Sequence, residues 1–291
     1  MIANIIRALE IRYGCCLERL TGGYTNITYL MTGTEPQLVA KVSNLSNEDT
    51  LNEINVMKLL QGSCDTPVVH DVSLLEGMRV IVMDCMRGVN AQSVLDAGDW
   101  TRADWIYRNM GQLLAAQIHS RPYVQQASGI RVSNRPGLAP MIRKLEFVPE
   151  SLGRQSVQLL SAAGDPEQPW VLTHGDYGVH NLLYEPESAL HVLDWEWAEW
   201  GNPLNDVAWV CWFTKLHYPV RAAELNAAFM EGYLSVHPLS FSPQQLKAAS
   251  LYKVWNVLHR LRIAPKEVQR EWVRRLEWTL HEDFTELHGV M

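Results

Sequence analysis

Short apolar and β-branched segments alternate with turn residues over the first 86 residues of the chain. Glycines at positions 22, 23 and 33 separate the first segments, which is typical of strands joined by tight turns. A stripe of apolar residues spaced three positions apart then follows, which is the pattern of an amphipathic helix. The predicted elements are strands over 15–20, 26–31 and 38–43, a helix over 47–61, and strands over 68–75 and 79–83.

The pattern becomes mainly helical after a break near residues 84–88. Ser242 begins one helix with the sequence of a capping box, because proline follows it directly and glutamine stands three positions later. The break predicts two domains, residues 1–86 and 87–291. The other elements expected after it are helices over 104–119 and 157–163, a loop over 128–140, short strands over 171–183 and 190–194 that flank a loop, and further helices from residue 205 onward.

The composition predicts a packed globular protein, since 47% of the residues are hydrophobic and the formal net charge is −7. An acidic balance disfavours a general nucleic-acid binder, which usually has a basic surface. It suits a cationic small ligand, and it equally suits plain solubility. The five cysteines form no CxxC pair, which disfavours a zinc site or a disulfide framework.

Apolar runs along the chain are short. Residues 1–14 lack the apolar core of a signal peptide. The run over 207–213 is far shorter than the roughly 20 residues of a transmembrane helix. We therefore expect a cytoplasmic protein that binds neither membrane nor nucleic acid.

Polar side chains gather in a short stretch between apolar segments near residue 180. His174, Asp176 and Asn181 form the pattern HxDxxxxN, and Asp194 ends the next apolar segment. Carboxylate and amide oxygens are the ligands that Mg²⁺ prefers, and a carboxylate can also orient an attacking hydroxyl. A hairpin over this stretch would bring the oxygen-bearing side chains together. The pattern favours a phosphoryl-transfer site over a hydrogen-bonded structural cluster, because unpaired acids in apolar surroundings are costly.

The first region contains groups that suit nucleotide phosphates. Lys41 lies within an apolar predicted strand, and Glu53 lies on the apolar face of the following helix. A Lys–Glu pair there would hold the ammonium near phosphate, although a solvated surface pair is the alternative. Gly22, Gly23 and Thr25 lie in a turn whose backbone N–H groups could approach phosphate, although a plain hairpin turn fits nearly as well.

These motifs, in this order along nearly the whole chain, resemble the aminoglycoside phosphotransferase and choline kinase superfamily, which is related to the protein kinases. The resemblance implies an α+β, two-lobed, protein-kinase-like fold. Its N-terminal lobe would hold an antiparallel sheet and one helix, and its C-terminal lobe would be mainly helical. It also implies ATP or another nucleoside triphosphate, Mg²⁺, and transfer of the γ-phosphate to a hydroxyl of a small molecule.

The resemblance implies roles for individual residues. Asp176 would be the catalytic base, and Asn181 and Asp194 would bind Mg²⁺. Lys41, held by Glu53, would contact the phosphates. The other implied positions are nucleotide contacts at Gly22, Gly23, Thr25 and the backbone of Asp84 and Met86, an adenine-pocket side chain at Met83, and loop supports at His174 and Asp206. Departures from the usual family pattern occur at Tyr177, His180 and Asn202, and none of them removes a ligand.

Five tryptophans crowd into residues 195–212. Trp209 and Trp212 lie three apart in an apolar helix and are expected in the core. Acidic residues interrupt the others, so an aromatic site for a cationic acceptor competes with plain core packing. The candidate substrate contacts are Glu196, Trp197 and Trp200. Together with Glu199 and Glu231 they suggest an aminoglycoside-, choline- or thiamine-like acceptor.

Two other hypotheses are a catalytically silent nucleotide-binding regulatory module of the same fold and a protein kinase. Lys41, Asp176, Asn181 and Asp194 are all intact, which disfavours a silent module. The chain contains no Asp-Phe-Gly and no recognisable activation segment before Asp206, which disfavours a protein kinase. The sequence predicts a small-molecule kinase that acts as a monomer or a homodimer.

Overall fold

The computed structural model describes residues 1–20, 26–43, 47–62, 65–124, 129–133, 142, 145–164, 168–186 and 189–283. The chain forms two compact units. Unit 1 comprises Met1–Ala97, Gln126–Ile130 and Val179–Ala198, and unit 2 comprises Gly98–Gln125, Arg131–Gly178 and Glu199–Met291. The two domains predicted from the sequence, residues 1–86 and 87–291, are the lobes of a kinase-like fold. They differ from these two units, and the boundary at residue 86 stays a prediction.

A five-stranded antiparallel sheet forms the centre of unit 1, in the order β1-β2-β3-β5-β4. Helix α2 lies between β3 and β4 along the chain. The bounds are β1 Cys16–Arg19, β2 Asn26–Thr32, β3 Leu38–Ser43, α2 Asn47–Leu60, β4 Val69–Leu75 and β5 Met78–Asp84. Each of these elements was predicted, to within one residue at either end.

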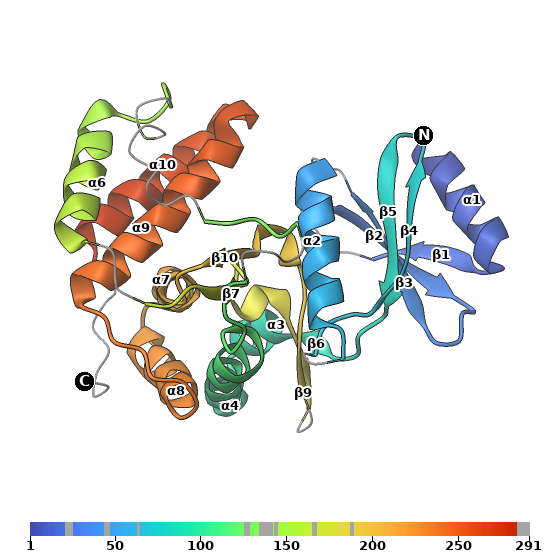
Figure 1. Cartoon of the computed structure of the whole chain (residues 1–291), viewed down its shortest axis with the longest axis horizontal. Helices are drawn as coiled ribbons and strands as arrows, with labels where there is room; N and C mark the ends of the chain where they lie inside the picture. The colour runs from blue at the N-terminus through green and yellow to red at the C-terminus, as the bar shows by residue number, and fades with distance from the viewer. Residues whose placement is uncertain are drawn as a thin grey trace. The chain divides into compact units, whose positions relative to one another are not determined.

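A further helix of unit 1, α1 (Ile2–Tyr13), was not predicted. Its buried residues Ile5 and Leu9 are four positions apart and therefore lie on the same helix face. They belong to one apolar cluster with alternate residues of β3 and β5. Figure 1 shows α1 and α2 on opposite sides of the sheet, so the central strands are covered on both faces.

The two faces of the sheet receive alternate side chains of β3, one face toward α1 and the other toward α2. Successive side chains of a strand point to opposite faces. Leu38, Ala40 and Val42 join the cluster that includes α1. Lys41 lies on the other face, where its ammonium reaches Glu53 of α2. The strand period therefore places a buried cation beside α2.

A small sheet in the order β6-β8-β9 completes unit 1. β8 and β9 form a hairpin whose register pairs Leu182 with Val192. The predicted strand over 171–183 was wrong as one element, because it divides into β7, a 3₁₀ turn and β8. The bounds are β6 Val89–Asn90, α3 Ala91–Asp96, the 3₁₀ turn Val179–Asn181, β8 Leu182–Glu185, β9 Ala189–Val192 and the 3₁₀ turn Trp195–Trp197.

Unit 2 is mainly helical, with a short antiparallel pair of strands, β7 and β10. The helix predicted over 104–119 and the one beginning after Ser242 are confirmed, and the capping box is formed. The bounds are α4 Trp100–Leu113, the π-helical turn Leu114–Ile118, α6 Glu150–Ala163, β7 Val171–Thr173, β10 Glu199–Gly201, α7 Leu204–His217, α8 Ala222–Leu234, α9 Pro243–Arg260 and α10 Lys266–His281.

Two close contacts fix the packing in unit 2. Helices α4 and α8 lie side by side (Figure 1), and glycine allows their backbones to meet. A Cβ atom at Gly111 or Gly232 would collide with the backbone of the facing helix.

Trp209 and Trp212 of α7 stack with ring centroids 4.4 Å apart and are buried, which confirms their expected place in the core.

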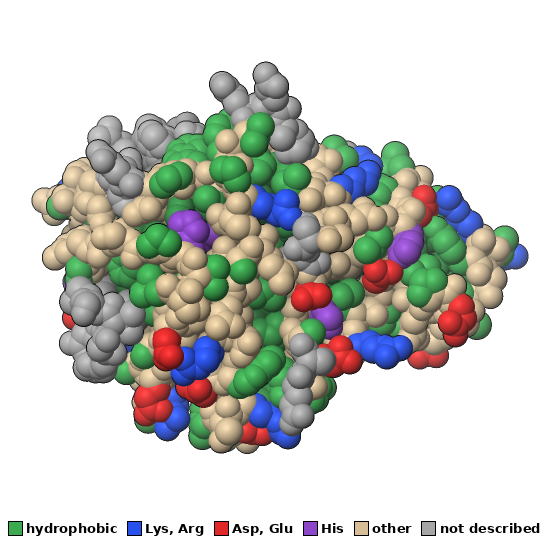
Figure 2. All heavy atoms as spheres, turned by 60° about the horizontal axis from the view of Figure 1, so that its bottom comes forward, with side chains coloured by type: hydrophobic (Ala, Val, Ile, Leu, Met, Phe, Trp, Pro, Cys, Tyr) green, Lys and Arg blue, Asp and Glu red, His purple; other side chains and the backbone are tan. Residues whose placement is uncertain are grey.

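Charged side chains of both signs lie next to one another on the face that Figure 2 shows. Ion pairs near the surface of unit 2 include Arg102–Asp99 and Arg108–Glu231, each of which joins an exposed side chain to a half-buried one. Among the residues that the structure describes, no helix combines the length and the apolar character needed to cross a bilayer.

Candidate functional site

An ion triad lies in unit 1, centred on Lys41. Its Nζ is 2.7 Å from Oε1 of Glu53 and 2.8 Å from Oδ1 of Asp194. The Lys41 and Glu53 side chains are buried, whereas 33% of the Asp194 side chain is exposed. The predicted Lys41–Glu53 pair is therefore formed, and the second carboxylate on Lys41 belongs to a predicted metal ligand.

Opposing electrostatic effects act on the triad. Burial alone would lower the pKa of Lys41, but the charges of Glu53 and Asp194 outweigh it and raise that pKa. Burial raises the pKa of Glu53, and the Lys41 charge opposes this rise. Because the ammonium lies at hydrogen-bond distance from both carboxylates, Lys41 stays charged and compensates them at neutral pH.

The β8–β9 hairpin places Asn181 and Asp194 at the same end of the small sheet. Asn181 directly precedes β8, and its carbonyl accepts a hydrogen bond of 2.9 Å from the N–H of Leu193. Asp194 follows Leu193 in a left-handed conformation, with φ 65° and ψ 68°. Such a conformation is uncommon for a residue with a Cβ, although Asp adopts it more readily than most, and residues held in it cluster at functional sites. The hairpin therefore brings together the two predicted metal ligands.

The chemistry of these donors fits Mg²⁺. Asn181 and Asp194 offer an amide oxygen and a carboxylate oxygen, and Mg²⁺ completes its shell with phosphate and water oxygens. Among the described residues, no group of three or more His, Cys, Asp or Glu side chains is arranged to hold a metal by itself. A protein site with two oxygen donors is typical of metals that arrive together with a nucleotide.

Glu196 and Trp197 are the predicted substrate contacts in unit 1. Glu196 is 3% exposed and accepts a hydrogen bond of 3.4 Å from Nδ2 of Asn26, whereas Trp197 is half-buried. Asn52 of α2 donates to the carbonyl of Ala198 over 2.8 Å and so ties this turn to the helix. The buried carboxylate of Glu196 thus has a structural use in unit 1, and its substrate role stays a prediction.

Nucleotide contacts were predicted at the end of β5 and just after it, from the backbone of Asp84 and Met86, and they stay predictions. The Asp84 N–H donates to Val68 and the Cys85 N–H donates to Gln37. The Asp84 carboxylate lies 2.6 Å from Nε2 of His70. None of these hydrogen bonds uses the Asp84 carbonyl or the Met86 N–H, which are the two backbone groups expected to contact the adenine. The predicted contacts Gly22, Gly23 and Thr25 lie outside the described residues.

In unit 2, a buried polar network holds the loop that contains Asp176. Asp206 accepts hydrogen bonds from the backbone N–H of His174 at 2.7 Å and of Gly175 at 2.8 Å. Its Oδ2 also lies 3.1 Å from Nε2 of His119, whose Nδ1 lies 2.8 Å from the Tyr233 hydroxyl. The loop support predicted for Asp206 is formed.

The charge of Asp206 depends on these donors. Burial would raise its pKa, but the hydrogen bond and charge of His119, together with His174, lower it overall. Asp206 is therefore ionised at neutral pH although it is fully buried. A carboxylate that accepts several hydrogen bonds gives the loop a fixed shape.

Asp176 itself is held by a tryptophan. The indole N–H of Trp209 donates to Oδ1 of Asp176 over 2.8 Å. Sequence analysis placed Trp209 in the core and missed this contact. A signal was present in the sequence, because Trp209 follows Asp206 by three positions and so lies near it on the same helix face.

Glu199 and Trp200 belong to β10 of unit 2. Trp200 is 3% exposed and lies against Tyr123, with ring centroids 5.8 Å apart. Glu199 keeps some exposed surface, yet its carboxyl is largely enclosed, and burial raises its pKa to about 7. Trp200 therefore packs inside unit 2, whereas Glu199 is an acid that titrates near neutral pH.

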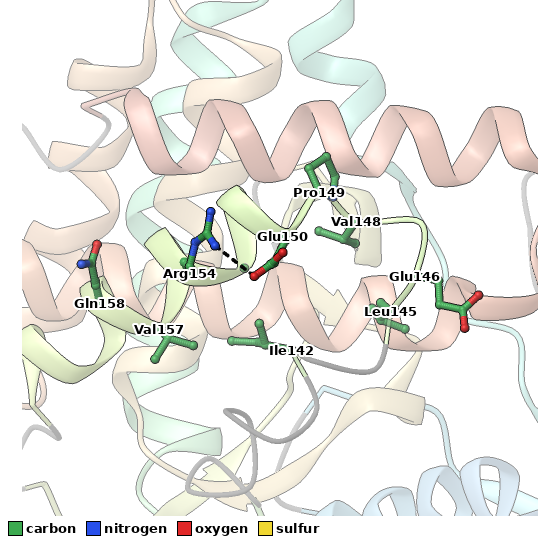
Figure 3. Close-up of a pocket in the computed structure, with 10 residues that line it drawn as sticks. Ile142, Leu145, Glu146, Val148, Pro149, Glu150, Arg154, Val157 and Gln158 are labelled. Carbon is green, nitrogen blue, oxygen red and sulfur yellow. Dashed lines mark hydrogen bonds and ion pairs between the residues drawn. The ribbon is translucent and has the colours of Figure 1, made fainter.

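A separate recess of about 810 Å³ lies in unit 2 along α6 and the residues before it. Figure 3 shows Ile142, Leu145 and Val148 near it, with an Arg154–Glu150 ion pair of 2.9 Å on α6. Among the described residues that line the recess, none is a predicted site residue.

Solved phosphotransferase structures share this fold. A thermostable mutant of aminoglycoside phosphotransferase APH(4)-Ia, in a ternary complex with ADP and hygromycin B, has a TM-score of 0.73 at 16% identity, with 95% of this chain and 98% of that chain covered. Spectinomycin phosphotransferase APH(9)-Ia, in complex with ADP and spectinomycin, has a TM-score of 0.66 at 15% identity, with 98% and 96% covered. Macrolide 2′-phosphotransferase MphH from Brachybacterium faecium has a TM-score of 0.68 at 17% identity, with 94% and 97% covered.

The sequence comparisons agree with the fold. Acyl-CoA dehydrogenase family member 10 of Mus musculus is 27% identical over 221 residues, which is 65% of this chain and 19% of that protein. The chain thus spans about a fifth of the length of that curated relative. Residues 17–248 match the model of the phosphotransferase enzyme family. Because this match spans most of the chain, the protein belongs to the phosphotransferase enzyme family, as the resemblance in its sequence implied.

Proposed function

We propose that the protein is an ATP-dependent O-phosphotransferase that transfers the γ-phosphate to a hydroxyl of a small molecule. The observation that supports this most strongly is the ion triad of unit 1. Lys41 is held at once by a buried glutamate and by a predicted metal ligand. Structures of the same fold were solved with ADP and with AMP-PNP, which supports a nucleotide as the phosphate donor.

Each charged group of unit 1 has a proposed task. Lys41 would neutralise phosphate charge while Glu53 keeps its ammonium in place. Asn181 and Asp194 would hold Mg²⁺, which neutralises further phosphate charge when it is bound. The partly exposed Asp194 can release its contact with Lys41 more readily than the buried Glu53 can, because water is available to it.

Asp176 of unit 2 would be the base. Its carboxylate accepts the proton of the acceptor hydroxyl as that oxygen forms a bond to the γ-phosphorus. The bond from the γ-phosphorus to the bridging oxygen of ADP breaks, and ADP leaves with that electron pair. Trp209 fixes the orientation of the carboxylate through its N–H, so the base is positioned before the acceptor arrives.

The acceptor class is proposed to be a hydroxylated small molecule. Proteins of similar fold were solved in complex with hygromycin B and spectinomycin, which are hydroxylated small molecules. Of the acids that suggest a cationic acceptor, Glu199 is the main remaining candidate. Glu196 is buried against Asn26, and Glu231 forms an ion pair with Arg108.

A coupled ADP-release assay tests the proposal. The purified protein with MgATP is screened against hygromycin B, spectinomycin, a macrolide, choline and thiamine. Release that depends on one acceptor, with phosphate found on that acceptor by mass spectrometry, supports the proposal. MgATP binding by calorimetry without ADP release for any acceptor would instead support the silent regulatory module.

Asp176→Asn provides the matched control, because it keeps the size and the hydrogen-bond acceptor of the side chain. Loss of the base should lower turnover by roughly 10² to 10⁴-fold, which is the usual contribution of general base catalysis. ADP affinity should stay within about twofold, since the groups proposed to bind nucleotide are in unit 1. Full turnover in this variant would exclude Asp176 as the base.

A further inference from the structure

Helix α9 of unit 2 contains a buried lysine in the surroundings of Asp176. Lys253 is 5% exposed, and its neighbours along the helix, Leu251 and Val254, are core residues. Its Nζ lies 5.4 Å from the ring centroid of Trp209, which is within the range of a cation–π contact. The indole N–H of the same Trp209 donates to Asp176. One aromatic ring thus contacts both the buried cation and the proposed base.

The charges around Lys253 do not fully offset its burial. Burial lowers the pKa of Lys253 to about 8, and the negative charge of Asp176 is the strongest effect that opposes it. Glu199 of β10 and Asp206 of α7 also attract the ammonium, whereas Arg260 of α9 repels it. A methionine would pack on this helix face at lower cost, because it carries no charge that must leave water. The fold therefore keeps a costly cation beside the base.

We propose that Lys253 is a positioning residue for Asp176, an inference that rests on the proposed function of Asp176. Its ammonium lies against the Trp209 ring and stabilises the indole whose N–H orients the carboxylate. Its charge also favours the ionised form of Asp176, which is the form that can accept a proton. Lys253 thus acts on Asp176 through the Trp209 ring and through the electrostatic field of its own ammonium, without contact to the acceptor.

Activity across pH distinguishes this role from a structural one. The probe is hydrolysis of MgATP in the absence of any other acceptor, so that water takes the phosphate, measured from pH 5.5 to 10. Lys253→Met should lower kcat by roughly tenfold and move the acidic limb of the profile about one unit to higher pH, since a coupling of one pKa unit corresponds to a factor of ten. KM for ATP should change less than about twofold.

Two matched variants complete the test. Lys253→Arg keeps the charge and should retain activity above pH 8, where wild type declines as Lys253 loses its proton. Lys247→Met removes a lysine from the same helix and should behave as wild type. Lys253→Met should melt at the same temperature as wild type or higher, because it removes a buried charge. A lower melting temperature with an unchanged pH profile would show a structural role and overturn the inference.

A second measurement needs no acceptor and no turnover. Coupling between two charges is reciprocal, so the charge of Asp176 must act on Lys253 as strongly as Lys253 acts on Asp176. NMR titration of ¹³C-labelled lysine, with the Lys253 signal assigned by its loss in Lys253→Arg, should show a pKa lower by about one unit in Asp176→Asn than in wild type. An unchanged Lys253 titration overturns the inference.

The outcomes separate this inference from the proposed function. If wild type releases ADP and Lys253→Met matches it at every pH, the inference fails and the proposed function stands. If wild type releases no ADP under any condition, the proposed function fails, and the role of Lys253 in it fails with it.

Discussion

Lys41 in unit 1 and Asp176 in unit 2 are both ionisable groups of the candidate site, but their hydrogen-bond partners differ in kind. Lys41 contacts two carboxyl groups, those of Glu53 and Asp194. Asp176 accepts a hydrogen bond from the neutral indole N–H of Trp209. The loop around it is held by backbone N–H groups that donate to Asp206.

This difference suits two different tasks. A phosphate can take the place of a carboxylate beside Lys41, and Mg²⁺ can take the place of the ammonium beside Asp194, because attraction between ions depends little on direction. Hydrogen bonds depend strongly on direction and therefore fix an orientation. If the proposed function holds, unit 1 would exchange charged partners, whereas unit 2 would keep a carboxylate in one orientation. Substitutions in each unit should therefore fail in different ways.

The largest effect on stability is expected from Lys41→Met. The variant leaves the carboxylate of Glu53 buried without its cation, which typically costs about 3 to 5 kcal/mol. Urea denaturation of the variant and of wild type at neutral pH measures this cost. The double variant Lys41→Met with Glu53→Gln should recover most of the loss. If the single variant costs less than about 1 kcal/mol, charge compensation does not stabilise unit 1.

A smaller loss is expected from Asp206→Asn in unit 2. Asparagine has one acceptor oxygen where aspartate has two, so at least one of the N–H donors from His174 or Gly175 loses its partner. A buried donor without a partner costs about 1 to 3 kcal/mol. The pKa of Asp206 is lowered in the folded protein, so its contribution is present above the unfolded pKa near 4 and is lost as pH falls through the folded value. Urea midpoints at pH 7 and pH 3 should show a deficit that shrinks in acid, and a constant deficit would contradict an ionised Asp206.

An effect of opposite sign, comparable in size to the Asp206→Asn loss, is expected from Glu199→Gln. Burial raises the pKa of Glu199 to about 7, so the folded protein binds a proton that the unfolded chain releases above pH 4.5. Wild type therefore loses stability as pH rises from about 4.5 to 7, whereas glutamine has no proton to lose. The variant should be more stable than wild type by about 1 to 3 kcal/mol at pH 8 and equal to it near pH 4. Thermal denaturation at both pH values measures this, and equal stability at pH 8 would show that Glu199 is solvated.

Two features of the structure, helix α1 and the contact of Trp209 with Asp176, were not predicted from the sequence, for identifiable reasons. Helix α1 has Met1 at its N-cap, with no side-chain cap hydrogen bond, so the usual start signal is missing. The contact between Trp209 and Asp176 joins residues 33 positions apart, which local pattern cannot relate. A buried tryptophan in an apolar helix gives the same sequence pattern whether or not its N–H has a functional partner.

The sequence by itself determined the strands of the five-stranded sheet, helix α2, the pairing of Lys41 with Glu53 and the family of the chain. The strands and the helix follow from the local periodicity of apolar residues. The family follows from short motifs and from their order along the chain. Tertiary structure decided the rest: the left-handed turn that brings Asp194 to Lys41, the network that makes Asp206 a loop support, and the place of Lys253 beside Trp209. Each of these depends on segments far apart in the chain, and the burial and charge they create exist only once those segments have packed together.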